Sequence, residues 1–368
     1  MGDCHFATAR LTVRLGAIAA NYRHFVALCP GVEVAAAVKA DAYGLGAAGV
    51  TPTLAAAGCS TFFVARLEEG IALRPLRPDA RIFLLDGVRQ GTETAVIAHR
   101  LIPALNSLAE VSLWSAAAAS RGETLDCAVH FDTGMNRLGL PAYEQPVLAA
   151  QGKHRLRHLN VVLWMSHLAC AEDSESPMNA LQRDRFRELL AQLPPACASL
   201  CASAGALLGR EYHFDLVRPG IGLYGGNPSI CLPNPFSVVA VLTGKILQVR
   251  RVDSGESVGY GATFRATRPT VLATVGLGYA DGLMRVIGNK GRGAITGVSA
   301  PIVGRVSMDL ATLDVTNVPA SALQVGADVE FLGDTISLEE FASLAGTASY
   351  EVLTSLGHRL PRHYEPAA

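Results

Sequence analysis

Lys39 is the residue whose type and position most directly suggest chemistry. It follows an apolar stretch in the segment EVAAAVKA (33–40), which reads as a buried strand. Burial disfavours the charged ammonium, lowers the pKa of the amine and favours the neutral form that attacks a carbonyl group. Lys39 is therefore a candidate Schiff-base nucleophile, although a lysine at a strand end can also extend its side chain into solvent.

Other apolar runs also end in reactive side chains. Asp41 and Tyr43 follow Lys39, and later runs end in or carry Asp132, His167, Ser203 and Arg218, with Arg137 shortly after Asp132. In a barrel of parallel strands, the carboxyl ends of the strands meet at one face and their loops surround one cavity. We therefore expect these side chains to share a single site.

The elements that would position these residues follow a repeated pattern. Between Glu33 and about Gly226, short apolar runs alternate with longer stretches of helical character, which is typical of βα units with a parallel sheet. The eight runs cover residues 33–40, 61–65, 81–87, 101–105, 126–134, 160–168, 196–203 and 215–225. Helices are expected between them, for example over 107–120 and 177–193. The pattern predicts an α/β fold with an N-terminal (β/α)8 barrel of the TIM type.

The pattern changes after Pro233 and Pro235. Segments such as FSVVAVLTGKILQVR (236–250), TVLATVGLGYADG (270–282) and ADVEFLGD (327–334) read as strands separated by glycine-rich turns. The sequence thus predicts two domains, a barrel over 1–233 and a mainly β domain over 234–368. The first ten or so residues could pair with the β domain.

Composition excludes several classes of function. The 368 residues carry 31 Lys and Arg against 32 Asp and Glu, so the formal net charge of −1 provides no field for binding nucleic acid or an anionic membrane. The start of the chain lacks the pattern of a secretory leader, and no apolar run is long enough to span a bilayer. We expect a cytoplasmic protein with no membrane partner. The eight scattered cysteines form no C-x-x-C pair, which favours reduced, mostly packed thiols and no metal site.

Nine segments, in order along the chain, resemble those of the alanine racemase family. They are AVKADAYGLG (37–46), DTGMNRLG (132–139), SHLACAED (166–173), SAGAL (203–207), VRPGIGLYG (217–225), VGYGATF (258–264), GLGYADGL (276–283), GRVSMDL (304–310) and YEVLTSLGHRLPRHY (350–364). The resemblance covers both domains. It implies a pyridoxal 5′-phosphate enzyme of fold type III that interconverts L- and D-alanine, and hence an isomerase. Such an enzyme either supplies D-alanine for peptidoglycan precursors or serves catabolism of one enantiomer, and the sequence does not separate these two roles.

The resemblance also implies a head-to-tail homodimer whose sites combine the barrel of one subunit with the β domain of the other. Racemisation removes a proton from one face of a carbon and returns one to the opposite face, so it needs two bases. By resemblance, Lys39 serves one face and Tyr260 of the second subunit serves the other. His167 matches the histidine that hydrogen-bonds this tyrosine, and Tyr260 would need nearby donors or positive charge to act as a base.

Further roles are implied for cofactor and substrate contacts. Arg218 matches the arginine that faces the pyridine nitrogen and keeps it unprotonated, which limits side reactions such as transamination. The matching phosphate contacts are Tyr43, Ser203, Gly220, the Ile221 amide and Tyr350. Arg137 and the Met308 backbone match groups that hold the substrate carboxylate. Tyr279 and Asp309 match residues at a narrow entrance that favours alanine-sized substrates.

Two positions depart from the family pattern. His130 occupies the place where many members carry a lysine carbamate that holds the arginine matching Arg137. We hypothesise that a bound anion such as chloride, or a hydrogen bond made by His130 itself, orients Arg137 instead. Ala202 occupies the place of an asparagine, so we expect altered cofactor retention or substrate tolerance.

Alternative activities remain open at this point. A serine or broad-specificity racemase on the same scaffold is the main alternative, because His130 and Ala202 both depart from the pattern. A fold-type III decarboxylase would place an acidic residue at the pyridine nitrogen, where this sequence has Arg218. A pyridoxal phosphate carrier would have neither the second domain nor Tyr260.

Overall fold

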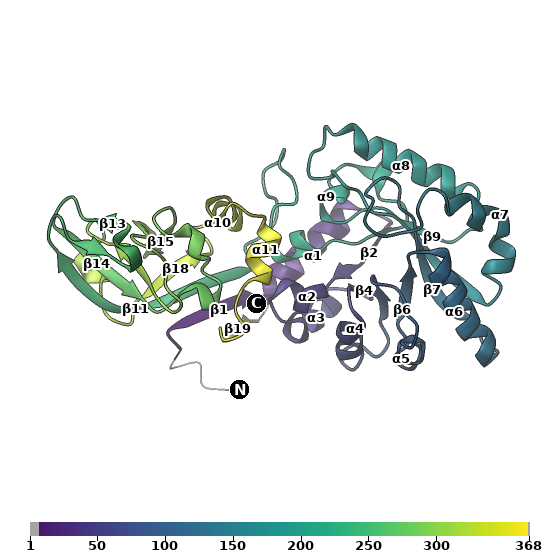
Figure 1. Cartoon of the computed structure of the whole chain (residues 1–368), viewed down its shortest axis with the longest axis horizontal. Coiled ribbons are helices and arrows are strands. Elements are labelled where there is room, and N and C mark those ends of the chain that lie inside the picture. The colour runs from purple at the N-terminus through teal and green to yellow at the C-terminus, as the bar shows by residue number, and fades with distance from the viewer. Residues whose placement is uncertain (1–6, 367–368) are drawn as a thin grey trace.

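The computed structural model describes residues 7–366, and it has two lobes arranged along one long axis (Figure 1). One lobe holds parallel strands surrounded by helices, and the other is mainly β. Helix α1 (Leu15–Leu28), the short helix α11 (Ser349–Thr354) and the last strand, β19 (Arg362–Glu365), lie where the two lobes meet.

The first lobe is a closed barrel of parallel strands. The strands are β2 (Glu33–Val34), β3 (Ala36–Ala37), β4 (Thr61–Val64), β5 (Arg81–Leu84), β6 (Ile102–Leu105), β7 (Leu125–His130), β8 (Leu159–Met165), β9 (Cys197–Ser199) and β10 (Leu216–Val217). Strands β3 to β9 form one sheet in sequence order, and β10 pairs with β2. Backbone hydrogen bonds from Asp215 to Ala198 and from Arg218 to Cys201 join β10 to β9, which closes the ring. Because β2 and β3 are one strand interrupted at Ala35, the barrel has the eight strands predicted at these positions.

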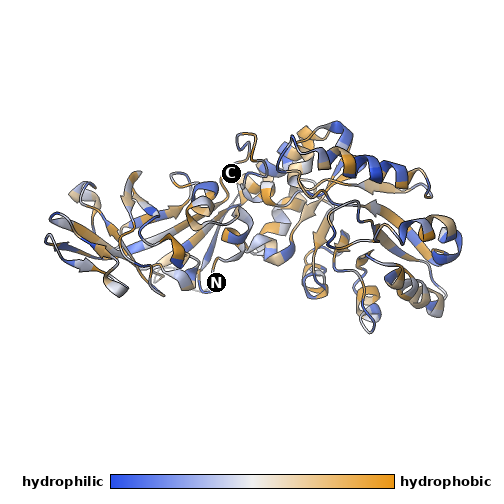
Figure 2. Cartoon of the chain, turned by 45° about the horizontal axis from the view of Figure 1, so that its top comes forward, coloured by the Kyte–Doolittle hydropathy of each residue, from blue (hydrophilic) through white to orange (hydrophobic). Residues whose placement is uncertain are grey.

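Helices surround this barrel. They are α3 (Ala47–Ala56), α4 (Leu67–Leu73), α5 (Glu93–Ala98), α6 (Leu108–Arg121), α7 (Gln145–Arg155), α8 (Pro177–Leu190) and the short α9 (Ser203–Ala206). Apolar residues follow the barrel strands, whereas the outer helices alternate between hydrophobic and hydrophilic residues (Figure 2). All four residues of β4 are buried, and the rings of Phe63 and Phe83 stack at 4.7 Å between centroids. Because the strands are buried on both faces, the barrel strands read as continuous apolar runs.

The second lobe is built on an eight-stranded sheet. Its strands are β1 (Ala9–Arg14), β11 (Ala240–Val252), β14 (Thr270–Val275), β15 (Arg292–Ile295), β16 (Val298–Pro301), β17 (Ala311–Asp314), β18 (Asp328–Leu332) and β19 (Arg362–Glu365). A hairpin of β12 (Ser257–Val258) and β13 (Phe264–Arg265) lies beside it. The segments predicted as strands after Pro235 all contain strands, so the mainly β character of this lobe is confirmed.

The first and last strands of the described chain join in this sheet. Strand β1 pairs antiparallel with β11 and parallel with β19, and it leads directly into α1 of the barrel lobe. The pairing therefore covers residues 9–14, within the range assigned to the barrel from sequence. Helices α10 (Leu338–Ala345) and α11 were not predicted. Helix α10 begins at Ser337, whose side chain accepts a hydrogen bond from the Glu340 amide in an ordinary N-cap.

Within residues 7–366, no helix is both long and apolar enough to cross a membrane. The seven cysteines in this part of the chain are all free, and four of them are buried, namely Cys29, Cys59, Cys127 and Cys201. Cys4 lies outside the described residues.

Candidate active site at the mouth of the barrel

A cavity of about 300 Å³ opens at the carboxyl ends of the barrel strands. Five residues predicted to share a site line it together, namely Lys39, Tyr43, Arg137, His167 and Arg218. The two departures from the family pattern, His130 and Ala202, line it as well. Among the described residues that line the cavity, Asp86 carries the only carboxylate. With two guanidinium groups and an amine, the cavity is suited to anionic ligands.

Lys39 extends into this cavity from the end of β3. Burial lowers the pKa of its amine, and the nearby positive charge of Arg137 lowers it further, while Glu69 and Asp86 act in the opposite direction. The neutral amine is therefore more populated than in a free lysine, as required for attack on a carbonyl.

The chain makes a left-handed turn immediately after Lys39, in the segment labelled α2 (Lys39–Tyr43). The φ angles of Ala40, Asp41, Ala42 and Tyr43 lie between 52° and 56°. This conformation costs roughly 1–2 kcal/mol per residue for L-amino acids, because Cβ comes too close to the following carbonyl oxygen. A hydrogen bond of 2.9 Å from the Ala42 amide to the Val38 carbonyl runs along the turn. Glu69 of α4 accepts the Ala40 amide at 2.6 Å.

Arg218 lies at the base of the cavity with 5% of its surface exposed. Its guanidinium donates to the Ser199 hydroxyl and, at 2.7 Å, to the Ser166 carbonyl, both at strand ends. Burial lowers the pKa of Arg218 to about 10, so the group remains charged at neutral pH. Held in this way, the guanidinium is a fixed cation facing the cavity.

His167 adjoins Arg218 and is neutral. Burial, followed by the charges of Arg218 and Arg137, places its pKa well below the ordinary value. A guanidinium nitrogen of Arg218 lies 3.4 Å from His167 Nδ1. Since guanidinium can only donate, Nδ1 is the acceptor and the proton resides on Nε2. His167 can thus donate one hydrogen bond from Nε2.

A compact cradle lies beside Lys39, where Ser203, Gly220 and Tyr43 meet. The Ser203 hydroxyl accepts the amides of Gly220 at 2.8 Å and Gly222 at 3.2 Å. A Cβ on Gly220 would lie 2.2 Å from the Tyr43 hydroxyl oxygen, so only glycine fits there. The Ser203 and Tyr43 hydroxyls, with the amide of Ile221 next in the chain, can donate to a phosphate group that approaches the backbone closely at Gly220. The donors and the cationic cavity therefore fit pyridoxal 5′-phosphate.

Aromatic rings and a loop complete this face of the barrel. The ring of Tyr43 packs against Tyr224 at 4.7 Å and Tyr350 of α11 at 6.1 Å between centroids. At the end of β7, the Asp132 carboxylate accepts the amides of Gly134, Met135 and Asn136, at 2.9, 2.9 and 3.1 Å. This loop brings Arg137 back to the cavity, so Asp132 shapes the loop and lies outside the cavity lining.

His130 is held by a residue that the sequence analysis did not identify. Its Nδ1 lies 2.8 Å from the side-chain oxygen of Asn106. The Asn106 side-chain nitrogen donates to the carbonyls of Leu85 and Ala104, so the amide orientation is fixed and its oxygen accepts from His130. Burial, with smaller contributions from Arg218 and Arg137, lowers the pKa of His130 to about 4.

The predicted residues of the β domain do not reach this cavity within one chain. Tyr260 is 72% exposed, Met308 53% and Tyr279 41%, and none of them lines the cavity. The loop at Met308 is nevertheless held by backbone contacts. The Tyr279 amide donates to the Ser307 carbonyl and the Ala280 amide donates to the Met308 carbonyl, both at 3.0 Å.

Asp309, next to Met308, is anchored from the C-terminal segment. Arg359 lies 2.7 Å from one of its carboxylate oxygens and 2.6 Å from Asp281, whose other oxygen accepts the Gly278 amide. The structure thus presents these side chains exposed and outside the lining of the barrel-mouth cavity of the same chain.

Several supporting residues were missed from sequence. Ser166 and Ser199 stand at predicted strand ends and could have been found by the same argument as Ser203. Gln182 gave no signal, because one polar residue on a helix is usually solvated. In the structure it is fully buried, and it accepts the Ala169 amide and donates to the His167 carbonyl.

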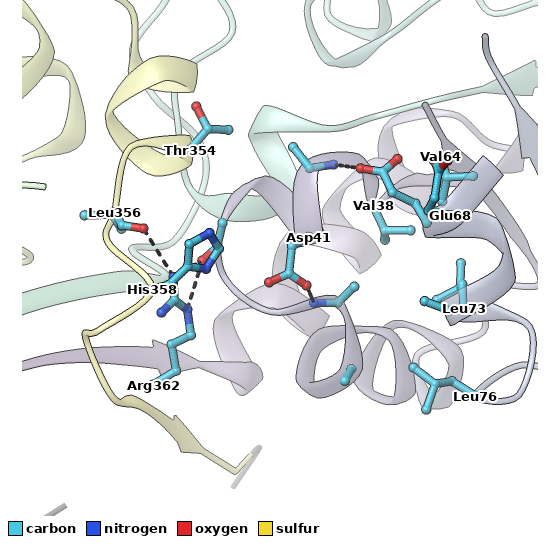
Figure 3. A pocket seen from close by; sticks show the side chains of 16 residues that line it. Val38, Asp41, Val64, Glu68, Leu73, Leu76, Thr354, Leu356, His358 and Arg362 are labelled. Atoms are coloured by element: carbon cyan, nitrogen blue, oxygen red, sulfur yellow. Dashed lines mark hydrogen bonds between the residues drawn. The ribbon is translucent and has the colours of Figure 1, made fainter. Parts of the chain in front are cut away.

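A second cavity, of about 580 Å³, lies on the outer side of the left-handed turn (Figure 3). It is bounded by α3, α4 and the segment 354–362, and its walls are mainly apolar. It includes Asp41, the carboxylate that accepts the Ala47 amide at 2.7 Å. Since Lys39 and Arg218 do not line it, this cavity is separate from the barrel mouth.

Comparisons with known proteins agree with this architecture. A model of the alanine racemase N-terminal domain matches residues 13–228, and one of the C-terminal domain matches residues 239–364. The chain is 49% identical to an alanine racemase of Rhodospirillum rubrum over 99% of this chain and 98% of that protein. It is 45% identical to a catabolic alanine racemase of Agrobacterium fabrum, over 97% and 92% of the two chains.

Solved structures give the same result. Alanine racemase from Bartonella henselae with covalently bound pyridoxal phosphate superposes with a TM-score of 0.94 at 39% identity, covering 98% of this chain and 100% of that one. The biosynthetic enzyme of Pseudomonas aeruginosa gives a TM-score of 0.90 at 34% identity, with the same coverage. On both sequence and structure, the chain belongs to the alanine racemase family.

Proposed function

We propose that the barrel mouth of one chain and the exposed β-domain residues of a second chain form the site of a two-base racemase. Family membership assigns the chain the pyridoxal phosphate-dependent interconversion of L- and D-alanine, an isomerase activity. The family, fold type, activity and cofactor predicted from sequence are therefore confirmed. The residue roles, the homodimer, a cytoplasmic location and a role in supplying D-alanine for peptidoglycan are proposals.

One observation supports the division of the site between chains. Lys39, His167 and Arg218 converge at the barrel mouth, whereas Tyr260 is exposed on the other lobe. An exposed tyrosine on a short 3-10 turn, at the tip of the β12–β13 hairpin, can enter the barrel mouth of a neighbouring molecule. A dimer that buries both surfaces would bring it there.

The residues present can hold pyridoxal phosphate and act around it. Tyr43, Ser203, Gly220, Ile221 and Tyr350 would hold the phosphate, and Lys39 would carry the cofactor covalently. When bound, the cofactor withdraws electrons from the α-carbon of the amino acid and so acidifies its proton.

Side chains on the two faces of the α-carbon of the substrate would remove its proton and return one. Lys39, with its lowered pKa, takes or returns the proton on one face. Tyr260 of the second chain does so on the other face. The Nε2–H of His167 donates to the Tyr260 oxygen and stabilises its phenolate. The fixed charge of Arg218 would keep the pyridine nitrogen of the bound cofactor unprotonated.

The substrate is held at its carboxylate. Arg137 at the cavity, with the backbone of Met308 from the second chain, would hold the carboxylate, while Tyr279 and Asp309 narrow the entrance. Ala202 lines the cavity where the family pattern has a larger amide side chain. This extra space favours tolerance of serine as a second substrate.

The experiment follows inversion and α-hydrogen exchange together. The purified protein is incubated in heavy water with each enantiomer of alanine, and in parallel with each enantiomer of serine. We expect the native protein to invert alanine and to introduce deuterium from the solvent at the α-carbon of alanine. Tyr260→Phe should lose inversion and keep exchange from one enantiomer only, because one base remains.

Tyr143→Phe is the matched control. Tyr143 is 78% exposed on the barrel lobe and does not line the cavity, so its variant should behave as the native protein. If Tyr260→Phe inverts both enantiomers at the native rate, Tyr260 is not the second base. Faster turnover of serine in the native protein than in Ala202→Asn would support the wider substrate range.

A further inference from the structure

The C-terminal strand β19 lies against the left-handed turn that follows Lys39. Arg362 donates from Nε and Nη2 to the Gly44 carbonyl, at 3.1 and 2.9 Å. Two residues later, the Tyr364 hydroxyl donates to the Leu45 carbonyl at 3.0 Å. Figure 3 shows the Arg362 side chain reaching the turn from the C-terminal segment. The end of the β domain thus contacts the segment that carries the catalytic lysine.

Arg362 is itself fixed by its own segment. Its remaining terminal nitrogen donates to the carbonyls of Gly357 at 3.2 Å and Leu360 at 3.0 Å. Strand β19 is paired with β1 in the large sheet of the β domain. The guanidinium therefore acts as a rigid link between that sheet and the Gly44 carbonyl.

The packing at this contact is close enough to require glycine at three positions. A Cβ on Gly46 would lie 2.0 Å from the Tyr364 hydroxyl oxygen, and one on Gly49 would lie 2.4 Å from the Tyr364 ring. A Cβ on Gly44 would lie 2.4 Å from the Leu353 carbonyl oxygen. Residues 44–49 are therefore shaped to receive the C-terminal segment.

The left-handed turn needs such support. Four consecutive non-glycine residues in this region are strained, and strained backbone persists only where surrounding contacts determine it. Glu69 holds the start of the turn at the Ala40 amide, while Arg362 and Tyr364 hold its exit at two carbonyls. The turn is thus held at both ends.

We propose that Arg362 and Tyr364 are positioning residues that keep the Lys39 turn in its left-handed conformation. Their contribution to catalysis rests on the proposed role of Lys39, whereas their effect on the turn does not. Through these contacts, the β domain of the same chain aligns the lysine of the barrel. This alignment is separate from the residues that a second chain would contribute to the site.

Hydrogen exchange tests the proposal on the full-length protein carrying pyridoxal phosphate. The amides of Ala42, Gly44 and Gly46 donate to carbonyls within the turn and report on its opening. We expect Arg362→Ala to speed their exchange by at least about tenfold, and Tyr364→Phe to do so by a smaller factor. Both variants should release the cofactor faster, and Arg362→Lys should recover part of the loss.

His363→Ala is the control, because His363 is exposed on the same strand between the two positioning residues. It should match the native protein in exchange and cofactor release. If Arg362→Ala and Tyr364→Phe lower the melting temperature but leave turn exchange and cofactor release unchanged, the proposal is overturned and both residues are merely structural. Should Arg362→Ala fail to fold, Tyr364→Phe and Arg362→Lys decide the question by the same readouts.

The outcome is distinct from a failure of the proposed function. A Lys39→Ala variant that still inverts alanine at the native rate would refute the role of the lysine, yet faster turn exchange in Arg362→Ala would still support the positioning of the turn.

Discussion

Subunit complementation gives a quantitative test of the shared active site. Lys39 lines the barrel-mouth cavity, while Tyr260 of the same chain is 72% exposed and absent from that lining. In a symmetric dimer, each site would take Lys39 from one chain and Tyr260 from the other. The perturbation is a pair of single variants, Lys39→Ala and Tyr260→Phe, made on separate chains. Each variant alone should lose at least about two to four orders of magnitude in racemisation rate, since each lacks one of the two proposed bases.

The expected magnitude follows from counting sites. When the two variants are mixed in equal amounts and their subunits exchange at random, about half of the dimers contain one chain of each. Such a mixed dimer has one site with both substitutions and one site with native Lys39 and native Tyr260. The mixture should therefore recover about one quarter of the native activity per site, which an enzyme-coupled alanine assay measures directly.

A second mixture distinguishes a site shared between chains from a site built within one chain. Native protein exchanged with an equal amount of the double variant Lys39→Ala/Tyr260→Phe should retain about one quarter of the native activity per site, because mixed dimers have one defect in each site. If each chain supplied both bases to its own site, this mixture would retain about one half and the first mixture would stay inactive. That pair of results would refute the shared site.

Three further predictions concern the barrel mouth. Gly220→Ala should weaken pyridoxal phosphate binding by roughly 5- to 150-fold, corresponding to about 1–3 kcal/mol of overpacking against Tyr43, as measured by equilibrium dialysis. Ser199→Ala removes a buried acceptor of Arg218 and should lower the free energy of unfolding in urea by about 1.5–3 kcal/mol. The pKa of His130 falls from an ordinary 6.5 to about 4 on folding, so unfolded chains bind more protons between these values. The free energy of unfolding should therefore fall by about 3 kcal/mol from this residue as the pH drops from 6.5 to 4, and His130→Asn should remove that part of the pH dependence.

The fold was largely predictable because burial leaves a direct trace in the sequence. Strands covered on both faces read as apolar runs, and all eight runs contain a barrel strand. Their ends were less predictable. The run 215–225 contains only two residues of strand before Arg218, and then a 3-10 turn at Ile221–Tyr224. Pro219 has no backbone N–H with which to continue the ladder, so the strand stops well before the apolar run does.

The pairing of β1 was predicted only as a possibility, since its partners lie more than two hundred residues away. Parallel pairing with β19 and antiparallel pairing with β11 satisfy both edges of β1, and neither partner can be read from residues 9–14. The left-handed turn was invisible for the same reason. Ala40 and Ala42 have no preference for positive φ, and the turn depends on contacts from α4 and β19.

The site could be predicted where topology alone brings residues together. Lys39, His167, Ser203 and Arg218 each follow a barrel strand, and parallel strands deliver their carboxyl ends to one face. The β-domain residues lay beyond this argument, because an exposed Tyr260 resembles any loop aromatic until a second chain is considered. Their assignment came from resemblance to the family alone.

His130 shows how the structure narrows a question that the sequence left open. Since Asn106 accepts from Nδ1, the proton of the neutral imidazole resides on Nδ1, and Nε2 carries a lone pair. With a pKa of about 4, His130 adds no charge to a cavity that already holds Arg137 and Arg218. A neutral acceptor can hydrogen-bond a guanidinium but cannot neutralise it, unlike a lysine carbamate. If Arg137 holds the substrate carboxylate, as the family resemblance implies, we expect its charge to remain available for that incoming anion, whereas a lysine carbamate would already form an ion pair with it.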